Sequence, residues 1–350
     1  MAYATIMSSF WNGSFVVEPR PVQNNALSNL LILSSDSTLD GDRYRAYASV
    51  AEATTDFDDG FLSAAALARV TTAFGQAVAP STLYVGRRNS GSETYAQALT
   101  AVAAAGLTFG LVDSDADSGS EATSVDSYVA ANLAISIITG AEGAWITGSP
   151  PASYPTTSDS TAVVYHPTAG QYPATAILAR AAGTNADLTR PDFTAPLTGV
   201  ATYNLSSTEA GHVLANHANP LEPLNDGGAV LYPPPGGVKA MSGEYLYTRF
   251  SVIYLTYRWR SAIATQYATF AAQNKVWPYN AAGEAALRGC LQPAIETGLA
   301  VGYFAPTDTL PRGYAITTTR AGSVITATVQ IGLLDGTTEV ITLTYLERAA

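Results

Sequence analysis

The chain has 350 residues, of which 47% are hydrophobic and only 13% are charged, and its formal net charge is −11. An average soluble domain carries about 25% charged residues, so we expect this charge-poor surface to be largely covered by other copies of the chain. The excess of acid lies in residues 35–200, which contain 17 acidic residues and seven arginines. This argues against nucleic acid as a partner of that half.

Residues 1–25 are expected to form an extended arm. The stretch SFVVEPRPV contains a short strand pattern that includes Phe15 and Val17. Pro19 and Pro21 restrict it to a sheet edge or a tail, because proline lacks the N–H donor that a central strand needs. The beginning of the chain lacks the basic start and apolar core of a signal peptide, and no run of about 20 apolar residues predicts a membrane span.

From Ala26 onward, short apolar strands alternate with helices. Strands are predicted at 27–35, 43–49, 81–87, 107–113, 144–148 and 161–166. Helices are predicted from about Phe61 to 76, with Asp58 and Asp59 at its N-terminal end, at 92–106 with Ser92 as N-cap, at 124–140, and at 172–183. This alternation is typical of a doubly wound, mostly parallel α/β sheet, which we place at residues 26–200.

The second half of the chain predicts a different architecture. After a Pro-, Thr- and Asp-rich linker at 183–200, the pattern indicates two long helices, at 244–273 and 281–302. The chain closes with alternating strand patterns. We therefore expect a C-terminal domain at 201–335 and an edge strand or arm at 336–350, which makes the whole chain α+β.

The register of the closing strands can be derived from the alternation of apolar residues. A two-residue Asp-Gly turn would place Ile341, Leu343 and Tyr345 on the wrong face, because a slip of one residue flips every side chain. A three-residue loop at 334–336 sets these residues opposite Val329, Ala327 and Ile325 in that order. A turn at Gly322–Ser323 sets Ile316 opposite Val329 and Tyr314 opposite Ile331. The predicted meander ends in an edge strand, which is open to pairing with another chain.

Several polar groups were weighed as sites of chemistry. Asp113, Asp115 and Asp117 match the first three ligands of a calcium loop, but Ser118 and Ser124 replace its glycine and glutamate, so we favour an acidic loop that caps the next helix. His212 and His217 are spaced five apart rather than the four of a helical zinc pair. His166 could form a triad with Ser160 and Asp159, but no nucleophile-elbow motif is present, so we favour a structural role.

Three further features have two interpretations each. Gly91 beside Arg87 and Arg88 permits anion binding, although no phosphate-loop pattern is met. The aromatic stretch 250–260 could be a nucleic-acid or sugar platform, but we favour a core or subunit contact. Cys290, the only cysteine, is expected to be a buried small apolar residue, and one cysteine excludes an intrachain disulfide framework.

Several stretches, taken together and in order, resemble the contractile tail sheath proteins of myophages, specifically the shorter two-domain sheath family. The match runs from about residue 43 to 310, while the two ends have no matching motif. The stretches are YASVAEATTDF (47–57), TAFGQAVAPSTLYVGRR (72–88), TFGLVDSDAD (108–117), STAVVYHPTAGQYPATAILARAAG (160–183), RPDFTAPLTGV (190–200) before the internal Asn219, GGVKAMSGEYL (236–246) and KVWPYNAAGEAALRGCLQPAIETGLAVGYFAP (275–306).

The resemblance implies a structural subunit without enzymatic activity or cofactor. Such subunits form stacked six-fold rings around a tail tube and contract to drive it through the host envelope. Implied partners are the chain itself, the tube, the baseplate and the tail terminator, in a virion tail assembled in the host cytoplasm. Terminal arms would pair with neighbouring subunits through Phe15, Val17, Ile341, Leu343 and Tyr345. We expect Arg258 and Arg260 to face the tube.

Two other classes of protein remain as alternatives. The first is a doubly wound, hydrolase-like enzyme with its site at the strand ends, where the sequence places Arg87, Asp113, Thr147 and His166 without a recognisable nucleophile–base pair. The second is a surface adhesion module, which the missing export signal and disulfides disfavour.

Overall fold

The computed structural model describes residues 26–149, 151–168, 170–191, 193, 196–223, 229–231, 237–275, 277–321, 324–333 and 338–346. These residues form two compact units. The α/β unit comprises 26–186 and 191–250, and the C-terminal unit comprises 187–190 and 251–346. The expected arm at 1–25, with Phe15 and Val17, lies outside the described residues.

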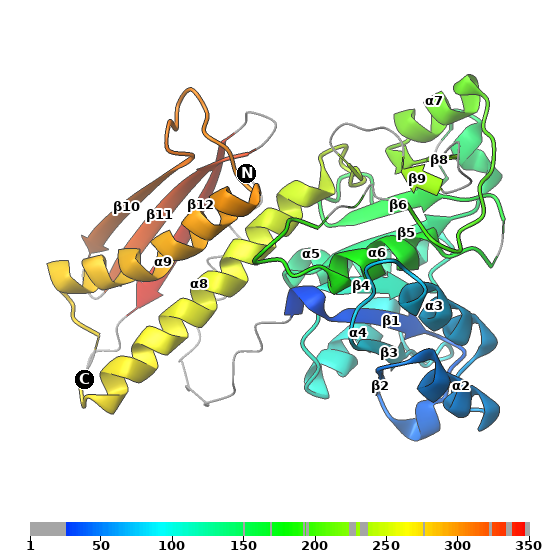
Figure 1. Ribbon diagram of the computed structural model, residues 1–350, viewed down its shortest axis with the longest axis horizontal. Helices are drawn as coiled ribbons and strands as arrows, with labels where there is room; N and C mark the ends of the chain where they lie inside the picture. The colour runs from blue at the N-terminus through cyan, green and yellow to red at the C-terminus, as the bar shows by residue number, and fades with distance from the viewer. Residues whose placement is uncertain are drawn as a thin grey trace. The chain divides into compact units, whose positions relative to one another are not determined.

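The α/β unit is built on a seven-stranded sheet with the order β2-β3-β1-β4-β5-β6-β7 (Figure 1). All neighbours pair in parallel except β2 and β3, which are antiparallel. The strands are β1 (Leu30–Ser34), β2 (Tyr44–Tyr47), β3 (Leu83–Arg87), β4 (Leu111–Ser114), β5 (Ile135–Gly140), β6 (Thr161–Tyr165) and β7 (Ala218–Asn219). The predicted doubly wound, mostly parallel sheet is confirmed.

Helices cover both faces of this sheet, which is why the first four residues of β1 are all apolar and the whole strand is buried. On one face, α4 and α5 pack their apolar residues against β1 and β4. The opposite face is covered by α3 and α6. The helices are α2 (Val50–Asp58), α3 (Ala64–Phe74), α4 (Tyr95–Ala104), α5 (Gly119–Ala131), α6 (Pro173–Gly183) and α7 (Ser207–Ala215), with 3-10 turns η1 (Ala26–Ser28), η2 (Leu39–Gly41) and η3 (Gly143–Ile146).

The predicted helix at 124–140 is wrong. The structure places helix α5 at Gly119–Ala131 and strand β5 at Ile135–Gly140. The break comes at Leu133, which adopts a positive φ of 43°, and the following segment is rich in β-branched residues that favour a strand. The predicted strand at 144–148 is also wrong, because this segment forms η3 around the buried Trp145.

One helix was not predicted, and two others begin at different residues than predicted. The sequence analysis missed α2, so Asp58 and Asp59 lie at the C-terminal end of that helix and not at the start of the next. Helix α3 begins instead after Ser63, whose side chain accepts a hydrogen bond from the Ala66 N–H. Helix α4 is capped by Thr94 rather than Ser92, in a capping box with Gln97.

Residues 201–250, which the sequence analysis assigned to the C-terminal domain, contribute β7 to the large sheet and also form the hairpin β8 (Leu221–Pro223) and β9 (Ala229–Leu231). The unit boundary lies after Phe250, within helix α8 (Leu246–Ala272). Phe250 packs edge-to-face on Phe193 within the α/β unit.

The C-terminal unit combines two helices with a three-stranded meander. Its elements are the remainder of α8, α9 (Ala281–Val301), β10 (Tyr314–Ala321), β11 (Val324–Gly332) and β12 (Thr338–Leu346). Helix α9 begins at the cap Asn280 and ends at Gly302, whose φ of 87° suits glycine. The buried Trp259 donates its indole N–H to the Leu291 carbonyl at 3.0 Å and thereby ties α8 to α9. Among the described residues, no helix is both long and apolar enough to cross a membrane.

Candidate assembly surfaces

The meander is antiparallel, in the order β10-β11-β12. Val329, Ala327 and Ile325 lie opposite Ile341, Leu343 and Tyr345, as the sequence predicts. The predicted pairs of β10, Tyr314 with Ile331 and Ile316 with Val329, are also confirmed. The loop at 334–336 lies outside the described residues.

The meander has one buried and one polar face. The four apolar residues of β11 that alternate along the strand are fully buried: Ile325, Ala327, Val329 and Ile331. On the other face, threonines of β10 and β11 lie opposite each other in the register: Thr317 with Thr328 and Thr319 with Thr326. Thr317 and Thr319 are exposed. These four side chains offer hydroxyl groups and no charge, so they are less costly to dehydrate than charged side chains.

Strand β12 is a nine-residue edge. Among the described strands it pairs with β11 alone. In an antiparallel ladder, alternate residues turn their N–H and C=O groups away from the paired strand. The backbone of β12 therefore presents a row of donors and acceptors to which an extended segment can add.

The edges of the large sheet are shorter, and one is closed by a side chain. The last strand, β7, has two residues, and the Asn219 amide donates to the carbonyls of Val163 and Lys239 at 2.9 and 2.8 Å. The Lys239 N–H donates to the Asn219 side-chain oxygen at 2.8 Å. The side chain of Asn219 thus substitutes for a further strand at this edge. The opposite edge, β2, has four residues. The longest edges of the described chain therefore lie in the meander.

Arg258, one of the two arginines expected to face a tube, is held inside its own unit. It forms an ion pair with Asp187, and its guanidinium lies 5.7 Å from the centre of the Tyr254 ring. Tyr254 in turn donates its hydroxyl to Asp187 at 3.0 Å. Partial burial lowers the pKa of Arg260. The sequence analysis missed Asp187, because a partner so distant along the chain leaves no local pattern.

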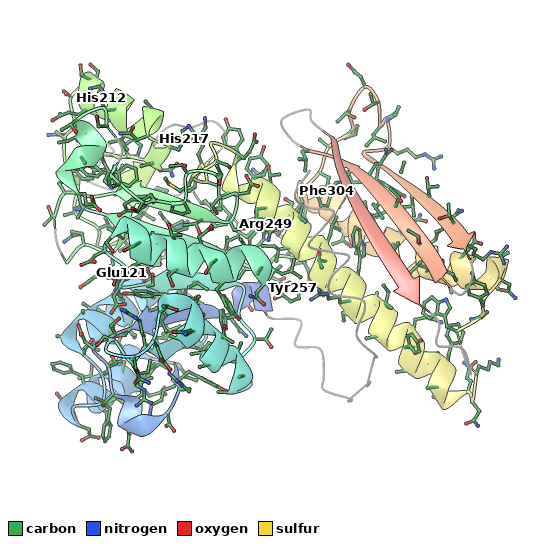
Figure 2. All side chains as sticks on the ribbon, turned by 180° about the vertical axis from the view of Figure 1, so that it is seen from behind. Glu121, His212, His217, Arg249, Tyr257 and Phe304 are labelled. Carbon is green, nitrogen blue, oxygen red and sulfur yellow. The ribbon has the colours of Figure 1, made fainter. Side chains whose placement is uncertain are left out.

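The aromatic stretch 250–260 packs mainly into the interior of the chain. Phe250, Tyr254 and Trp259 are each about 1% exposed. These three residues therefore form core contacts, which is one of the two contacts favoured from the sequence, and they are too buried to serve as a binding platform. Tyr257 is partly buried on α8 (Figure 2).

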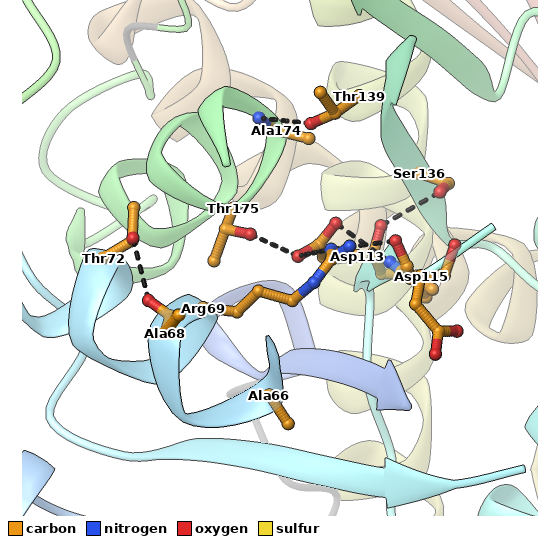
Figure 3. Close-up of polar contacts among 12 residues, drawn as sticks. Ala66, Ala68, Arg69, Thr72, Asp113, Asp115, Ser136, Thr139, Ala174 and Thr175 are labelled. Carbon is orange, nitrogen blue, oxygen red and sulfur yellow. Dashed lines mark hydrogen bonds and ion pairs between the residues drawn. The ribbon is translucent and has the colours of Figure 1, made fainter. Parts of the chain in front are cut away.

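The strand ends of the large sheet hold a network of paired side chains (Figure 3). Arg69 on α3 donates to the fully buried Asp113 at 2.8 Å, and Thr175 on α6 also donates its hydroxyl to Asp113. Asp115 accepts hydrogen bonds from the Ser35 N–H at 2.6 Å and the Tyr95 hydroxyl at 2.9 Å. Two of the three carboxylates weighed as calcium ligands are thus occupied by protein donors.

The remaining carboxylate of that set lies beside helix α5. The Asp117 N–H donates to Glu121 at 3.1 Å, just before α5 begins. The described part of the chain contains no group of three or more His, Cys, Asp or Glu side chains able to hold a metal ion.

The triad suggested for His166 is not assembled. His166 follows the end of β6, and Ser160 precedes its beginning, so the two lie about 20 Å apart at a rise of about 3.3 Å per residue. The buried His166 ring accepts from the Thr168 N–H at 3.1 Å, which leaves its other nitrogen to donate to the Ala201 carbonyl at 3.0 Å. This histidine fixes a loop at the strand end.

The other candidates are also held by local contacts. His212 lies on α7, whereas His217 follows that helix and contacts the Met241 carbonyl at 2.8 Å (Figure 2). The Thr147 hydroxyl donates to the Ala144 carbonyl, and Arg87 donates to the Thr38 carbonyl. Cys290 is buried as expected, and burial raises the pKa of its thiol to about 11.

Arg88, considered for anion binding, has protein partners on several sides. It donates to the Ser35 hydroxyl at 2.9 Å, lies 3.6 Å from Glu121 and stacks 4.1 Å from the centre of the Tyr95 ring. Arg87, Asp113, Thr147 and His166 are thus each hydrogen-bonded to a residue outside this set of four.

No protein-family model matches the chain, and no curated protein sequence matches it significantly. Among solved structures, a chain of the anti-feeding prophage helical sheath in the contracted state has a TM-score of 0.61 at 14% identity, covering 97% of this chain and 96% of that one. A chain of the anti-feeding prophage baseplate gives the same values. The sheath tail protein of Listeria innocua has a TM-score of 0.59 at 11% identity, covering 99% of this chain and 98% of that one. The chain has the fold of contractile sheath proteins along nearly its whole length.

Proposed function

We propose that the chain is the structural subunit of a contractile phage tail sheath. Its copies polymerise as stacked hexameric rings around a tail tube, and the stack contracts to drive the tube through the host envelope. The protein acts as a part of the virion tail, assembled in the host cytoplasm, and not as an enzyme. Its partners are its own copies, the tube protein, the baseplate and the tail terminator.

The observation that carries this proposal is the likeness to sheath chains over at least 97% of this chain. A match of that extent includes the meander as well as the large sheet. One of the similar structures is a helical sheath and another is a six-fold symmetrised baseplate, which supports a role in a tail assembly. The low content of charged residues supports extensive burial between copies.

The edge of β12 supplies the means of connection. We infer that an arm of a neighbouring copy, with Phe15 and Val17, pairs along the edge that carries Ile341, Leu343 and Tyr345. Each added backbone hydrogen bond contributes about 0.5–1.5 kcal/mol, so a few per subunit, repeated along a tube, hold a continuous mesh. Backbone pairing also tolerates twisting between copies, which contraction requires.

Electron microscopy of the full-length protein at high concentration, with and without residues 337–350, tests the proposal. We expect tubes or rings from the full chain and dispersed particles from the truncated one. Circular dichroism and size-exclusion chromatography establish whether the truncated chain is folded. Tubes from the truncated chain would contradict the role of β12, and a full chain that stays monomeric would contradict the sheath itself.

A further inference from the structure

A groove runs between α8 and α9 of the C-terminal unit. It encloses about 440 Å³ and is lined mainly by small side chains, with Ser261 and Ala262 on α8 and Gly289, Ala294 and Thr297 on α9. A Cβ added at Gly289 would meet no atom within 4 Å. This volume lies within the roughly 300–1,000 Å³ of pockets that bind small molecules, so the groove has room for large side chains that the described residues of this unit do not supply.

The segment that lines the groove through Asp187 also carries an exposed apolar side chain. Leu188 is 75% exposed, the most of any large hydrophobic residue among those described. Its neighbours hold the backbone in place, since Asp187 binds Tyr254 and Arg258, and Arg190 donates to the Gly302 carbonyl. Leu188 is therefore held next in sequence to a residue that lines the groove.

One tryptophan of the chain lies outside the described residues. Of its four tryptophans, Trp145, Trp259 and Trp277 are each at most 1% exposed. The fourth, Trp11, lies in the leading segment beside Phe10. Large aromatic side chains contribute most to binding energy when they are buried. The small residues of the groove leave space for side chains of that size.

We propose that the groove between α8 and α9 receives Phe10 and Trp11 of a second copy of this chain. This inference rests on the proposed function and specifies where the beginning of the arm binds after its strand has paired with β12. Trp11 would stack on the Arg258 guanidinium, as tryptophan is the strongest aromatic partner of a cation.

Charge and reach are both compatible with this occupant. The leading 25 residues carry Glu18 and Arg20 and no other charged side chain, so their side-chain charge is zero. The groove is likewise neutral, because its charged residues, Asp187 and Arg258, are paired. The 14 residues from Trp11 to Asn25 span up to about 48 Å when extended, which is enough to reach an adjacent copy.

Cross-linking between two different full-length variants tests the proposal. One variant carries Ser9→Cys and the other Thr297→Cys, both with Cys290→Ala so that each chain has a single thiol. We expect mild oxidation of the mixture to give a disulfide-linked dimer of the two variants. Gly289→Leu in the groove chain should abolish this dimer, because the new side chain fills the groove. Gly211→Leu is the matched control, as its Cβ also meets no atom within 4 Å but lies on α7.

The outcomes separate this proposal from the proposed function. Absence of the mixed dimer, or a dimer that persists with Gly289→Leu, overturns the groove as the receiver. If a disulfide forms only within a chain that carries both cysteines, the groove binds the chain's own arm, and the proposal of a second copy is wrong. Electron microscopy of the unmodified chain tests the sheath function independently. If tubes form but the mixed dimer does not, the proposed sheath function stands and only the proposed groove contact is wrong.

Discussion

Asp113 holds a carboxylate fully out of solvent at the end of β4, where Arg69 and Thr175 bind it. Removing one partner of a buried ion pair typically destabilises a protein by about 3–5 kcal/mol, because the other charge is left unpaired. We therefore expect Arg69→Met to lower the free energy of unfolding by about that amount. Urea denaturation of the purified subunit measures this change.

A double variant shows whether the loss comes from the pair itself. Asp113→Asn keeps an oxygen for the Thr175 hydroxyl but removes the charge that Arg69→Met leaves unpaired. The double variant should then lose less stability than the sum of the two single losses. Additive losses would show that the ion pair is not what stabilises this strand end.

Glu93 gives the stability a dependence on pH. It forms a two-point ion pair with Arg43, and hydrogen bonding to Arg43 lowers the pKa of Glu93 from 4.5 to about 2. A depressed carboxylate pKa stabilises the fold above the ordinary value of 4.5, and this contribution disappears as the pH falls toward 2. Glu93→Gln should lower the free energy of unfolding at neutral pH by about 1 kcal/mol.

Measuring stability over a range of pH shows whether the effect of Glu93→Gln comes from the lost charge. The stability difference between Glu93→Gln and the unchanged chain should shrink as acid protonates Glu93, and urea denaturation at a series of pH values follows it. A difference that stays constant down to the lowest pH would mean that shape, and not charge, is what the glutamine disrupts.

At the scale of elements, the alternation of backbone groups along β12 predicts an alternating response to proline. Proline removes the N–H of one residue. Where that N–H pairs with β11, the substitution should destabilise the meander, and where it points outward, it should only block pairing with another chain. We expect single prolines at Ile341, Thr342, Leu343 and Thr344 to alternate between the two effects.

Two measurements on each proline variant separate these effects. Thermal denaturation reports the stability of the subunit, and negative-stain microscopy reports assembly. Either the two variants at Ile341 and Leu343 or the two at Thr342 and Thr344 should be folded but unable to form tubes. If every folded proline variant still forms tubes, the outer edge of β12 takes no part in assembly.

The same alternation explains which elements were predictable from the sequence. In the meander, apolar and polar residues alternate without interruption along β11, so one register alone buries Ile325, Ala327 and Val329 together, and the structure has that register. At 124–140 no such rule applies, because a buried helix and a buried parallel strand are both apolar. The boundary between α5 and β5 depends on the positive φ of Leu133, which no sequence pattern predicts.

The candidate sites were less predictable, since their contacts join distant parts of the chain. Arg258 was identified from the sequence, but its partner Asp187 lies in another region and is brought to it only by the fold. Asp113 was noted for its acidic neighbours, whereas its binding to Arg69 depends on how α3 packs. A local pattern shows which residues are charged and cannot show which charges meet.

At the scale of the whole molecule, the acidic α/β unit and the almost neutral C-terminal part suggest different surroundings in an assembly. Residues 201–350 carry ten acidic and nine basic side chains, with Arg249, Arg258 and Arg260 close together in sequence. Arg249 is 4% exposed and donates to the Ala130 carbonyl, so it is engaged within the fold. Arg258 is paired with Asp187 in the groove between α8 and α9, so Arg260 is the residue that we propose to face the tube.

Charge reversal at Arg260 tests this orientation without breaking the ion pair between Arg258 and Asp187. We expect Arg260→Glu to weaken loading onto tail tubes, most strongly at low salt, because salt screens the attraction between charges on two surfaces, with a screening length of about 10 Å at 0.1 M. Self-assembly without tubes should be unchanged, and Arg260→Lys, which keeps the charge, should load normally. Co-sedimentation with tubes over a salt series measures loading. Equal loading of all three chains at every salt concentration would place the tube contact elsewhere, and loss of self-assembly in Arg260→Glu would mean that Arg260 contacts another copy and not the tube.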